Sequence, residues 1–307
     1  MIRVDINVGD IVKKINISGQ VKLHEPMSRH TSFQIGGPAD IYTVPVDEAD
    51  IVLIAGVAHS EEVPLFVLGA GANILVSDKG IRGIVMDMSR FTDIEVKGQN
   101  LHSGAGAEIS VAAEIAAQHS LSGLEFIYKM PGSVGGALWM NARCYGQSIS
   151  EVPGTVHYLD EALMHQILSL PDPRFAYKKS PFQGSSTILL SLDLMLQTAD
   201  HAAIWTRMQE VQDDRRSKGH FEHPSAGSVF KNNRSFGMPS GKILDELGLR
   251  GLQRGGAQIA PFHANIIINN GTASAEDVRG LILHAQKIAY EKRNIVLDPE
   301  IRLVGDW

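Results

Sequence analysis

Residues 63–75 have the sequence VPLFVLGAGANIL, in which a short apolar run is followed by two glycines separated by one residue. Residues 63–68 predict a buried strand and residues 69–73 predict a loop. Glycines let the backbone approach a bulky anion, and successive N–H groups can surround phosphate oxygens. The third glycine of the dinucleotide fingerprint is missing. A plain structural turn is therefore an equally good interpretation of this loop alone.

Two further glycine-rich segments favour the phosphate interpretation. Residues 130–137, MPGSVGGA, lead into an apolar segment, 137–140, that can form a helix. The partial positive charge at a helix N-terminus attracts a pyrophosphate. Residues 35–38, IGGP, lie upstream. Close packing of small residues is the alternative, but the set as a whole favours several backbone approaches to one large dinucleotide.

The rest of the chain predicts the mixed helices and strands of an α+β protein. The strongest predicted helix spans residues 275–293, where Ser274 can cap the N-terminus with Asp277 three residues later. The other predicted helices are residues 47–60, 111–119, 201–216 and 240–247, and the other predicted strands are residues 84–88, 94–97, 187–196, 266–268 and 297–303. The pattern predicts one α+β unit that ends near residue 198 and a second domain after it.

Composition narrows the class of protein. The chain has 307 residues and a formal net charge of −6, which argues against nucleic acid as a partner. Its one cysteine, Cys144, excludes an intramolecular disulfide and a cysteine-rich zinc site. There is no apolar run of about 18 residues, and residues 1–20 lack the apolar core of a signal peptide. We expect a cytoplasmic protein with neither a nucleic-acid nor a membrane partner, and no metal.

Two segments in the second half of the chain carry candidate acids. Ser228 lies between a glycine and an apolar pair, where its hydroxyl can donate a proton to a strong base such as an enolate. A strand-edge serine that bonds to its own backbone is the alternative. Glu300 and Arg302 alternate with apolar residues and would share one strand face. They are either a surface ion pair or a recognition pair for a carboxylate-bearing substrate.

Residues 177–180, YKKS, place two cations beside an aromatic ring, or form a basic loop in water. The signatures of zinc proteases, P-loop NTPases and serine esterases are not found in the sequence.

Taken in order, these segments resemble the UDP-N-acetylenolpyruvoylglucosamine reductase family over residues 30–305. The motifs that carry the resemblance are HTSF at 30–33 with GG at 36–37, GAGANIL at 69–75, PGSVGGA at 131–137 with NA at 141–142, SAGSVFKN at 225–232, GKILDELGL at 241–249, GGAQ at 255–258 with HAN at 263–265, and PEIR at 299–302. The short link after Gln183 is similar to the branch of the family without an extra tyrosine-bearing loop.

The resemblance implies an α+β fold with an FAD-binding domain of the PCMH or vanillyl-alcohol-oxidase type. This domain would consist of two α+β subdomains and be followed by an α+β substrate-binding domain. The implied boundaries are a lead-in at 1–30, the FAD domain at 31–198 with a division near 92, and the substrate-binding domain at 199–307. The resemblance also implies non-covalent FAD, NADPH as reductant, and the enolpyruvyl group of a UDP-sugar as acceptor in peptidoglycan precursor synthesis.

The family's site residues can be carried over by motif. Hydride would reach the terminal enolpyruvyl carbon through the flavin, and negative charge would develop beside the carboxylate, where it needs stabilisation. The resemblance implies Ser228 as proton donor, Glu300 as catalytic carboxylate and Lys178 at the third catalytic position. Substrate would bind Lys218, Asn232 and His263. The implied cofactor-binding residues are Thr31, Gly69, Ala70, Gly71, Ala72, Asn73, Ile74, Gly132, Ser133, Val134, Gly135 and Ala137.

Some positions depart from the family pattern. Lys178 stands where the family has arginine, and lysine offers a point charge instead of a bidentate fork. Lys179 or Arg174 would be the substitute cations. Residues 143–144, Arg-Cys, replace a small Gly-Ala pair and would crowd the flavin or add a charge there. Asn233 replaces a proline, which predicts a mild loop change.

Two other functions stay open at this point. An oxidase of the same FAD fold would act on a sugar acid or alcohol, but the Ser228 and Glu300 segments argue against it. So does the lack of a covalent flavin attachment pattern. A flavin- or nucleotide-binding homologue with weakened catalysis is suggested by Lys178. For each of these functions we expect a monomer.

Overall fold

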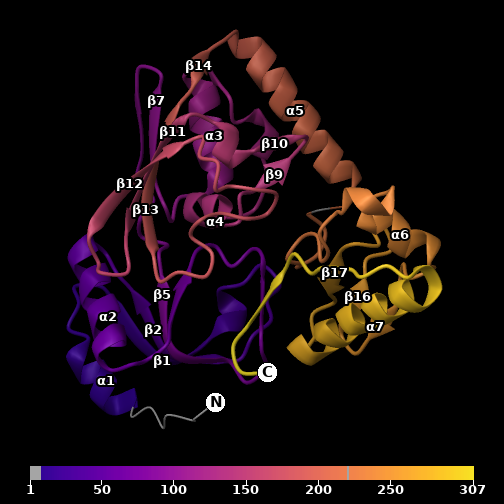
Figure 1. Ribbon diagram of the computed structural model, residues 1–307, viewed down its shortest axis with the longest axis horizontal. Coiled ribbons are helices and arrows are strands. Elements are labelled where there is room, and N and C mark those ends of the chain that lie inside the picture. The colour runs from indigo at the N-terminus through magenta and orange to yellow at the C-terminus, as the bar shows by residue number, and fades with distance from the viewer. Residues whose placement is uncertain (1–7, 220) are drawn as a thin grey trace. The chain divides into compact units, whose positions relative to one another are not determined.

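The computed structural model describes residues 8–219 and 221–307 and divides into two compact units (Figure 1). Unit 1 comprises Met1–Leu23, Ile41–Ala70 and Gly83–Asp214, and unit 2 comprises His24–Asp40, Gly71–Arg82 and Arg215–Trp307. Unit 2 thus includes two segments from the first third of the chain. The functional boundaries at residues 31, 92 and 199 remain a prediction, and residues 1–7 of the predicted lead-in lie outside the described residues.

A four-stranded sheet has the strand order β1-β2-β5-β3 and belongs mainly to unit 1. Its strands are β1 (Gln20–Pro26), β2 (Pro38–Val44), β3 (Leu65–Leu68) and β5 (Ile81–Asp87), and β3 runs parallel to β5. The helices α1 (Val8–Lys14) and α2 (Glu48–Ser60) pack on it (Figure 1), with Ile51 and Ile54 in the same apolar core as Ile41. Asp47 caps α2 because its side chain accepts a hydrogen bond from the Asp50 amide at 2.9 Å.

An antiparallel five-stranded sheet forms much of the rest of unit 1, in the order β12-β11-β13-β7-β6. Its strands are β6 (Ile94–Lys97), β7 (Asn100–Gly104), β11 (Gly154–Leu159), β12 (His165–Leu170) and β13 (Ile188–Met195). The helices α3 (Ile109–Gln118) and α4 (Val134–Trp139) lie on one face (Figure 1) and share an apolar core with Leu101 and Leu192. Because side chains alternate along a strand, Asp193 and Met195 of β13 lie on the opposite face.

Several smaller elements belong to unit 1 or to unit 2. The short strands are β8 (Leu121–Ser122), β9 (Arg143–Cys144), β10 (Gln147–Ser148) and β14 (Gln197–Thr198), and the helix α5 is His201–Ser217. Single 3₁₀ turns occur at Met27–Arg29, Glu125–Ile127, Ile149–Glu151 and Arg234–Phe236.

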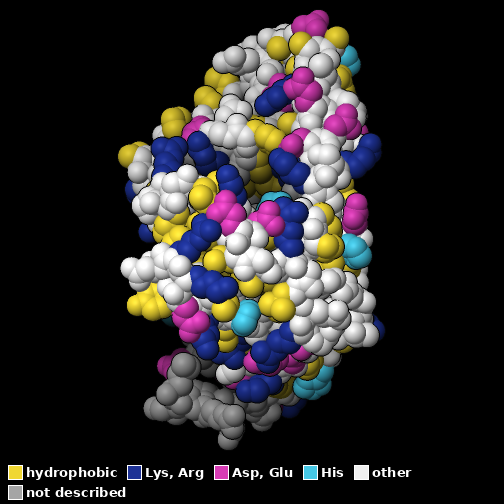
Figure 2. Space-filling view, turned by 90° about the vertical axis from the view of Figure 1, so that its right-hand side faces the viewer, with side chains coloured by type: hydrophobic (Ala, Val, Ile, Leu, Met, Phe, Trp, Pro, Cys, Tyr) yellow, Lys and Arg dark blue, Asp and Glu magenta, His cyan; other side chains and the backbone are white. Residues whose placement is uncertain are grey.

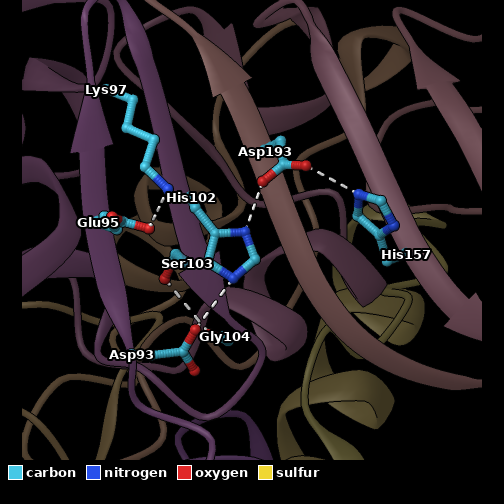
Figure 3. A network of polar contacts seen from close by, with 8 residues as sticks. All are labelled: Asp93, Glu95, Lys97, His102, Ser103, Gly104, His157 and Asp193. Carbon is cyan, nitrogen blue, oxygen red and sulfur yellow. Dashed lines mark hydrogen bonds and ion pairs between the residues drawn. The ribbon is translucent and has the colours of Figure 1, made fainter.

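The open face of the five-stranded sheet carries a chain of polar contacts (Figure 3). The Asp193 carboxylate contacts Nδ1 of His102 at 2.5 Å and Nε2 of His157 at 2.8 Å. The other ring nitrogen of His102 lies 3.0 Å from the Asp93 carboxylate. These contacts link β7, β11 and β13, so they tie three neighbouring strands together.

Unit 2 is built around short strands and the helix α7 (Ala275–Arg293). The strands β15 (Gln253–Arg254), β16 (Ala257–Ile259) and β17 (Ile267–Asn269) form an antiparallel sheet, and β4 (Ile74–Val76) pairs in parallel with β18 (Arg302–Val304). The helix α6 is Ser240–Glu246. Ser274 and Asp277 form the predicted capping box of α7. Asp78 adds a second cap by accepting hydrogen bonds from the amides of Ala275 and Glu276 at 2.8 and 3.0 Å.

Most predicted elements are confirmed, with ends shifted by a few residues. The helix α7 agrees with its prediction at both ends. The prediction of one continuous strand over residues 297–303 is wrong in part, since the regular strand β18 begins only at Arg302. The physical reason is a change of partner: the Glu300 amide bonds to Val229, whereas the Arg302 amide bonds to Asn73. Within the described residues, the helices are too short or too polar to cross a membrane.

Candidate functional site

In unit 1, the end of β3 meets the N-terminus of α4. A Cβ atom on residue 69 would lie 2.2 Å from Oγ of Ser133, so a side chain there would have to displace the Ser133 hydroxyl. Ser133 is the N-cap of α4 and accepts a hydrogen bond from the Gly136 amide at 3.2 Å. Two predicted cofactor segments therefore meet at the carboxyl end of the parallel strands, where ligands bind in many α/β folds.

The loop at residues 69–73 presents a row of backbone N–H groups. Among the described residues, the amides of these five positions donate to no protein acceptor, although Gly71 is buried. Buried amides without a partner are rare in folded proteins. Successive N–H groups suit phosphate oxygens. The loop thus has the features of an anion-binding cradle, which the sequence left undecided.

Neighbouring backbone fixes the conformation of the loop. Gly71 has a φ of +63°, and a Cβ atom there would lie 2.1 Å from the His30 carbonyl oxygen. The Ser32 amide donates to the Gly71 carbonyl at 3.2 Å. Thr31 is buried, and its hydroxyl donates to the Ile35 carbonyl at 2.9 Å. Thr31 therefore lies beside the loop, but its hydroxyl stabilises its own turn.

The glycines at the start of α4 have different roles. Gly132 has a φ of +138° and no heavy atom within 4 Å of a built Cβ, which leaves open space beside the backbone. Gly135 packs on Ala105, whose Cβ would lie 2.9 Å from a Cβ at residue 135. The small-residue packing alternative therefore applies to Gly135.

Some of the other predicted cofactor-binding residues in these two segments have backbone amides or side chains that are already engaged within the protein. The amides of Val134 and Gly135 donate to the carbonyls of Ala107 and Ala105, each at 2.8 Å. These two amides are thus already used within the protein. The side chains of Val134, Ala137 and Ile74 are buried, whereas Ala70 is exposed and Ala72 half-buried.

Ser228 and Glu300 lie on adjacent segments of unit 2. The Glu300 amide donates to the carbonyl of Val229 at 2.7 Å. On its other side, the backbone of Ser228 pairs with Ile266. Both Ser228 and Glu300 are half-buried, while Val229 is fully buried. The structure thus sets the backbone segments of the predicted proton donor and the predicted catalytic carboxylate side by side, although they are far apart in the chain.

Asn73 connects the glycine loop to the segment of Glu300. Its side-chain nitrogen donates to the Glu300 carbonyl at 3.2 Å, and its own carbonyl accepts from the Arg302 amide at 3.0 Å. β18 then continues beside β4, with Arg302 paired to Ile74. Much of the Arg302 side chain is accessible to solvent. The protein around its guanidinium nevertheless removes part of the hydration of that charge, and this desolvation lowers the pKa of Arg302.

The predicted substrate-binding residues also belong to unit 2. Nδ1 of His263 accepts from the Asn265 amide at 3.2 Å, so the ring proton of the neutral form is on Nε2. Burial lowers the pKa of His263, and the charges of Lys218 and Arg250 lower it further. The imidazole is therefore neutral at pH 7, with Lys218 close enough to act on it. Asn232 accepts from the Ser240 amide at 2.9 Å and so helps to begin α6.

Lys178 lies in a two-residue turn of unit 1. The backbones of Ala176 and Lys179 exchange hydrogen bonds at 3.1 and 3.0 Å, and Lys178 has a φ of +56°. The Lys178 carbonyl accepts from Nε2 of Gln183 at 3.2 Å. The same nitrogen donates to the Trp139 carbonyl at 2.9 Å. The turn is thus attached to the C-terminal end of α4, the helix that begins at the glycine-rich segment.

Arg174 does not offer a second cation for the site. Its guanidinium binds the Asp172 carboxylate through two hydrogen bonds of 2.9 Å. These bonds raise the pKa of Arg174 and hold the pKa of Asp172 below its usual value. Lys178 and Lys179 remain the candidates for the third catalytic position.

Arg143 and Cys144 form part of a small hairpin. The Arg143 guanidinium donates to the hydroxyl of Ser148 at 2.8 Å and to the carboxylate of Glu151 at 2.9 Å. Arg143 therefore stabilises its own hairpin, which accounts for its charge without a flavin contact. The hairpin tip is attached to α5, because the Tyr145 hydroxyl donates to the Asp214 carboxylate at 2.7 Å.

Two buried asparagines hold the reactive segments but were not among the predicted site residues. The Asn265 side chain bonds both to the amide and to the carbonyl of Phe230, at 2.9 and 2.8 Å. Asn141 donates to the Ala176 carbonyl at 2.8 Å and so supports the Lys178 turn. Both lie in motifs of the family resemblance, HAN and NA, which was the only signal for them in the sequence.

Metal-ligating groups can be compared over the residues that the structure describes, and surface charge over one face of the molecule. In the described part of the chain, no group of three or more His, Cys, Asp or Glu side chains is arranged to hold a metal ion. Figure 2 shows one face of the molecule, on which Lys and Arg side chains are interspersed with acidic, apolar and uncharged ones.

Comparison with known proteins first defines a class. A profile of FAD binding domains matches residues 39–161, and a profile of the C-terminal domain of UDP-N-acetylenolpyruvoylglucosamine reductase matches residues 219–304. With the amide-lined glycine loop, these matches define a flavin-dependent oxidoreductase. The predicted α+β architecture with an FAD-binding domain of this type is confirmed.

Individual relatives then define the family. UDP-N-acetylenolpyruvoylglucosamine reductase of Caldanaerobacter subterraneus subsp. tengcongensis is 40% identical, covering 97% of this chain and 98% of the relative. That of Treponema denticola is 39% identical, covering 94% and 95%. The crystal structure of the Thermus caldophilus enzyme has a TM-score of 0.80 and 29% identity, covering 93% of this chain and 99% of that one. The chain belongs to the UDP-N-acetylenolpyruvoylglucosamine reductase family.

Proposed function

We propose that this chain reduces the enolpyruvyl group of UDP-N-acetylglucosamine enolpyruvate to give UDP-N-acetylmuramate. NADPH is the reductant, FAD is the non-covalent cofactor, and the product feeds peptidoglycan synthesis. The observation that carries the proposal is the 2.7 Å hydrogen bond from the Glu300 amide to Val229, which sets the carboxylate segment beside Ser228. Relatives that carry the reductase name, at 40% and 39% identity, support it.

The residues of the glycine loop fit FAD. The five amides of residues 69–73 donate to no acceptor among the described residues, and the missing side chain of Gly69 keeps the backbone accessible. When bound, FAD supplies the transfer of hydride from NADPH to the substrate. The chain's own residues bind, orient and protonate.

Ser228 is the proposed proton donor. Addition of hydride to the terminal enolpyruvyl carbon leaves negative charge on the carbon next to the carboxylate, which is basic enough to take a proton from a hydroxyl. Glu300 supplies the catalytic carboxyl group on the adjacent segment. The half-buried position of both residues restricts access of water to the proton transfer.

Positively charged residues are the proposed partners of the substrate's anionic groups. Lys178 stabilises the charge that develops at the substrate carboxylate, because a cation matters most where charge appears in the transition state. Lys218 binds a phosphate or carboxylate, with Asn232 and the neutral His263 as hydrogen-bonding partners. The favoured Nε2–H tautomer of His263 makes it a donor.

We propose further that the enzyme works as a monomer in the cytoplasm and, through the supply of peptidoglycan precursors, serves cell shape and division. The single Cys144 suits a reducing compartment.

The two half-reactions test the function. The purified protein should be yellow and release FAD. Under anaerobic conditions NADPH should bleach the flavin, and the enolpyruvyl UDP-sugar should restore its colour. Steady NADPH oxidation should require the sugar. Rapid oxygen consumption with an alcohol or sugar acid, without NADPH, would instead identify an oxidase, and an inert flavin would identify a binding homologue.

A further inference from the structure

Glu300 is held by hydrogen bonds on both of its peptide groups. Its amide donates to the Val229 carbonyl at 2.7 Å, and its carbonyl accepts from the side-chain nitrogen of Asn73 at 3.2 Å. Asn73 also contacts Arg302, two residues after Glu300: the Asn73 carbonyl accepts a hydrogen bond from the Arg302 amide at 3.0 Å. One residue of the glycine loop therefore bonds on both sides of Ile301.

These bonds determine where the Glu300 side chain starts. A Cα–Cβ bond has a fixed direction relative to the two peptide planes that flank it, so fixing both planes fixes that direction. Glu300 precedes the regular strand β18 (Arg302–Val304), so the contact from Asn73 to the Glu300 carbonyl lies outside the β18 ladder. Loss of that contact would let the second peptide plane rotate and the carboxylate move.

Asn73 is also the last residue of the loop whose amides donate to no acceptor among the described residues. Binding of an anion to those amides would restrict the backbone of Asn73, and with it the position of its side chain. We propose that Asn73 is a positioning residue for Glu300, which couples occupancy of the cofactor loop to the orientation of the catalytic carboxylate. The inference rests on the proposed function for the role of Glu300.

Two variants separate this role from simple cofactor binding. Asn73→Asp keeps the size of the side chain but replaces the donor with an oxygen that repels the Glu300 carbonyl. Asn73→Ala removes the donor without a new charge and decides the test if the aspartate variant fails to retain FAD. Asn270→Asp is the matched control, because Asn270 is exposed in unit 2 and its side chain bonds to Gln258 at 3.3 Å.

The half-reactions of FAD-loaded protein give the first readout. In the Asn73 variants, flavin reduction by NADPH should stay within about 2-fold of the natural rate. Reoxidation by the enolpyruvyl sugar should slow about 10-fold, which corresponds to the loss of one hydrogen bond. The kcat should fall while KM for the sugar stays within about 2-fold. In a Glu300→Gln background, Asn73→Asp should add less than about 2-fold, because coupled residues are not additive.

Amide hydrogen exchange gives a readout that needs no turnover. The Glu300 amide should exchange faster in the Asn73 variants than in natural and Asn270→Asp protein, with FAD bound and after its removal. Equal slowing of both half-reactions, an unchanged reoxidation rate, or additivity with Glu300→Gln would overturn the proposal. If natural protein is not reoxidised by the sugar at all, the proposed function fails. Faster exchange in the variants would then still support the positioning contact.

Discussion

The proposed catalytic role of the Ser228 hydroxyl requires that neighbouring segments hold the Ser228 backbone in a fixed position. Its backbone lies between Ile266 on one side and the segment of Glu300 on the other, and Val229 next to it is buried. Asn265 fixes Phe230 through both of its peptide groups, so the Ser228 segment cannot shift independently. A serine held in this way can meet a carbanion in a fixed direction, which a serine on a mobile surface turn cannot do.

Replacement of Ser228 should therefore affect one half-reaction only. In Ser228→Ala, flavin reduction by NADPH should remain near the natural rate, whereas reoxidation by the enolpyruvyl sugar should slow by about 100-fold or more. Anaerobic stopped-flow absorbance measures both rates. Ser235→Ala, at an exposed serine of the same unit, should leave both rates unchanged. Equal losses in the two half-reactions would refute the role of Ser228 as proton donor.

The charge of Lys178 should matter more than the charge of its neighbour. Lys178→Met keeps an unbranched side chain for the turn but removes the cation, so reoxidation should slow by about 100-fold, as for loss of one stabilising group. Lys178→Arg should be at least as fast as the natural protein, since arginine grips a carboxylate through two bonds. Single-turnover measurement of flavin reoxidation by the sugar gives this rate. Lys179→Met is the control, and its reoxidation rate should stay within about 2-fold of that of the natural protein. The opposite result for the two lysines would assign the role to Lys179.

At the level of residues, sequence could nominate Ser228 and Glu300 but not the residues that hold them. The nomination came from motifs that keep their local pattern, as in SAGSVFKN and PEIR. Asn265 and Asn141 act through bonds to backbone groups of segments distant in the chain, and no periodicity reports such bonds. The departure at Arg143 was visible, but its effect depended on Ser148 and Glu151, which a single sequence does not place around it.

Among the elements, the junction of β3 and α4 shows how tightly the cofactor segments are fitted. Residue 69 is glycine because Oγ of Ser133 would lie 2.2 Å from a Cβ there, and Ser133 is needed as the cap of α4. The close approach leaves the backbone of the loop uncovered by side chains.

Gly69→Ala should therefore displace the cap and lower the free energy of unfolding by about 1–3 kcal/mol, with reduced FAD occupancy. Ser133→Gly in the same chain should restore part of the stability, because it removes the colliding oxygen and glycine is a tolerable N-cap. Gly56→Ala is the matched control. No heavy atom lies within 4 Å of a Cβ built in that helix position, so stability should rise by up to about 1 kcal/mol. Denaturant unfolding measures each variant, and additive losses in the double variant would contradict the collision.

Helices were easier to predict than strands for a physical reason. The signals for α7 are local: a cap at Ser274, an acid at Asp277 and an apolar stripe, so both ends could be predicted. Strand boundaries depend on partners elsewhere. The segment ending in β18 changes partner between Glu300 and Arg302, and this change has no trace in its alternating pattern.

At the scale of the whole molecule, the two compact units are not consecutive in sequence. Unit 2 takes His24–Asp40 and Gly71–Arg82 from the N-terminal third, and the cofactor loop changes unit between Ala70 and Gly71. A reading of the chain from one end to the other yields consecutive domains, because composition and periodicity carry no information on which distant segments pack together.

The polar chain on the five-stranded sheet links strands across unit 1 and makes stability depend on pH (Figure 3). Burial acts to raise the pKa of Asp193, but hydrogen bonds from His102 and His157 and attraction to those rings outweigh it, so its pKa is below the usual value. The two ring nitrogens of His102 contact different carboxylates, Nδ1 that of Asp193 at 2.5 Å and Nε2 that of Asp93 at 3.0 Å. Glu95 and Lys97 pair with each other beside this chain at 2.9 Å.

Because the folded-state pKa of Asp193 lies below that of the unfolded chain, its carboxylate favours folding above about pH 4. That contribution disappears as the pH falls through the lowered pKa. Asp193→Asn should therefore reduce the free energy of unfolding at pH 7 by about 0.5–1 kcal/mol, a modest value because solvent screens this partly exposed group. The difference from natural protein should shrink steadily below pH 4. Urea unfolding between pH 3 and 8 measures it, with Glu95→Gln on the same face as a control that should change stability by less than about 0.5 kcal/mol. A difference between Asp193→Asn and natural protein that persists undiminished in acid would show that packing, and not the charge of Asp193, holds these strands together.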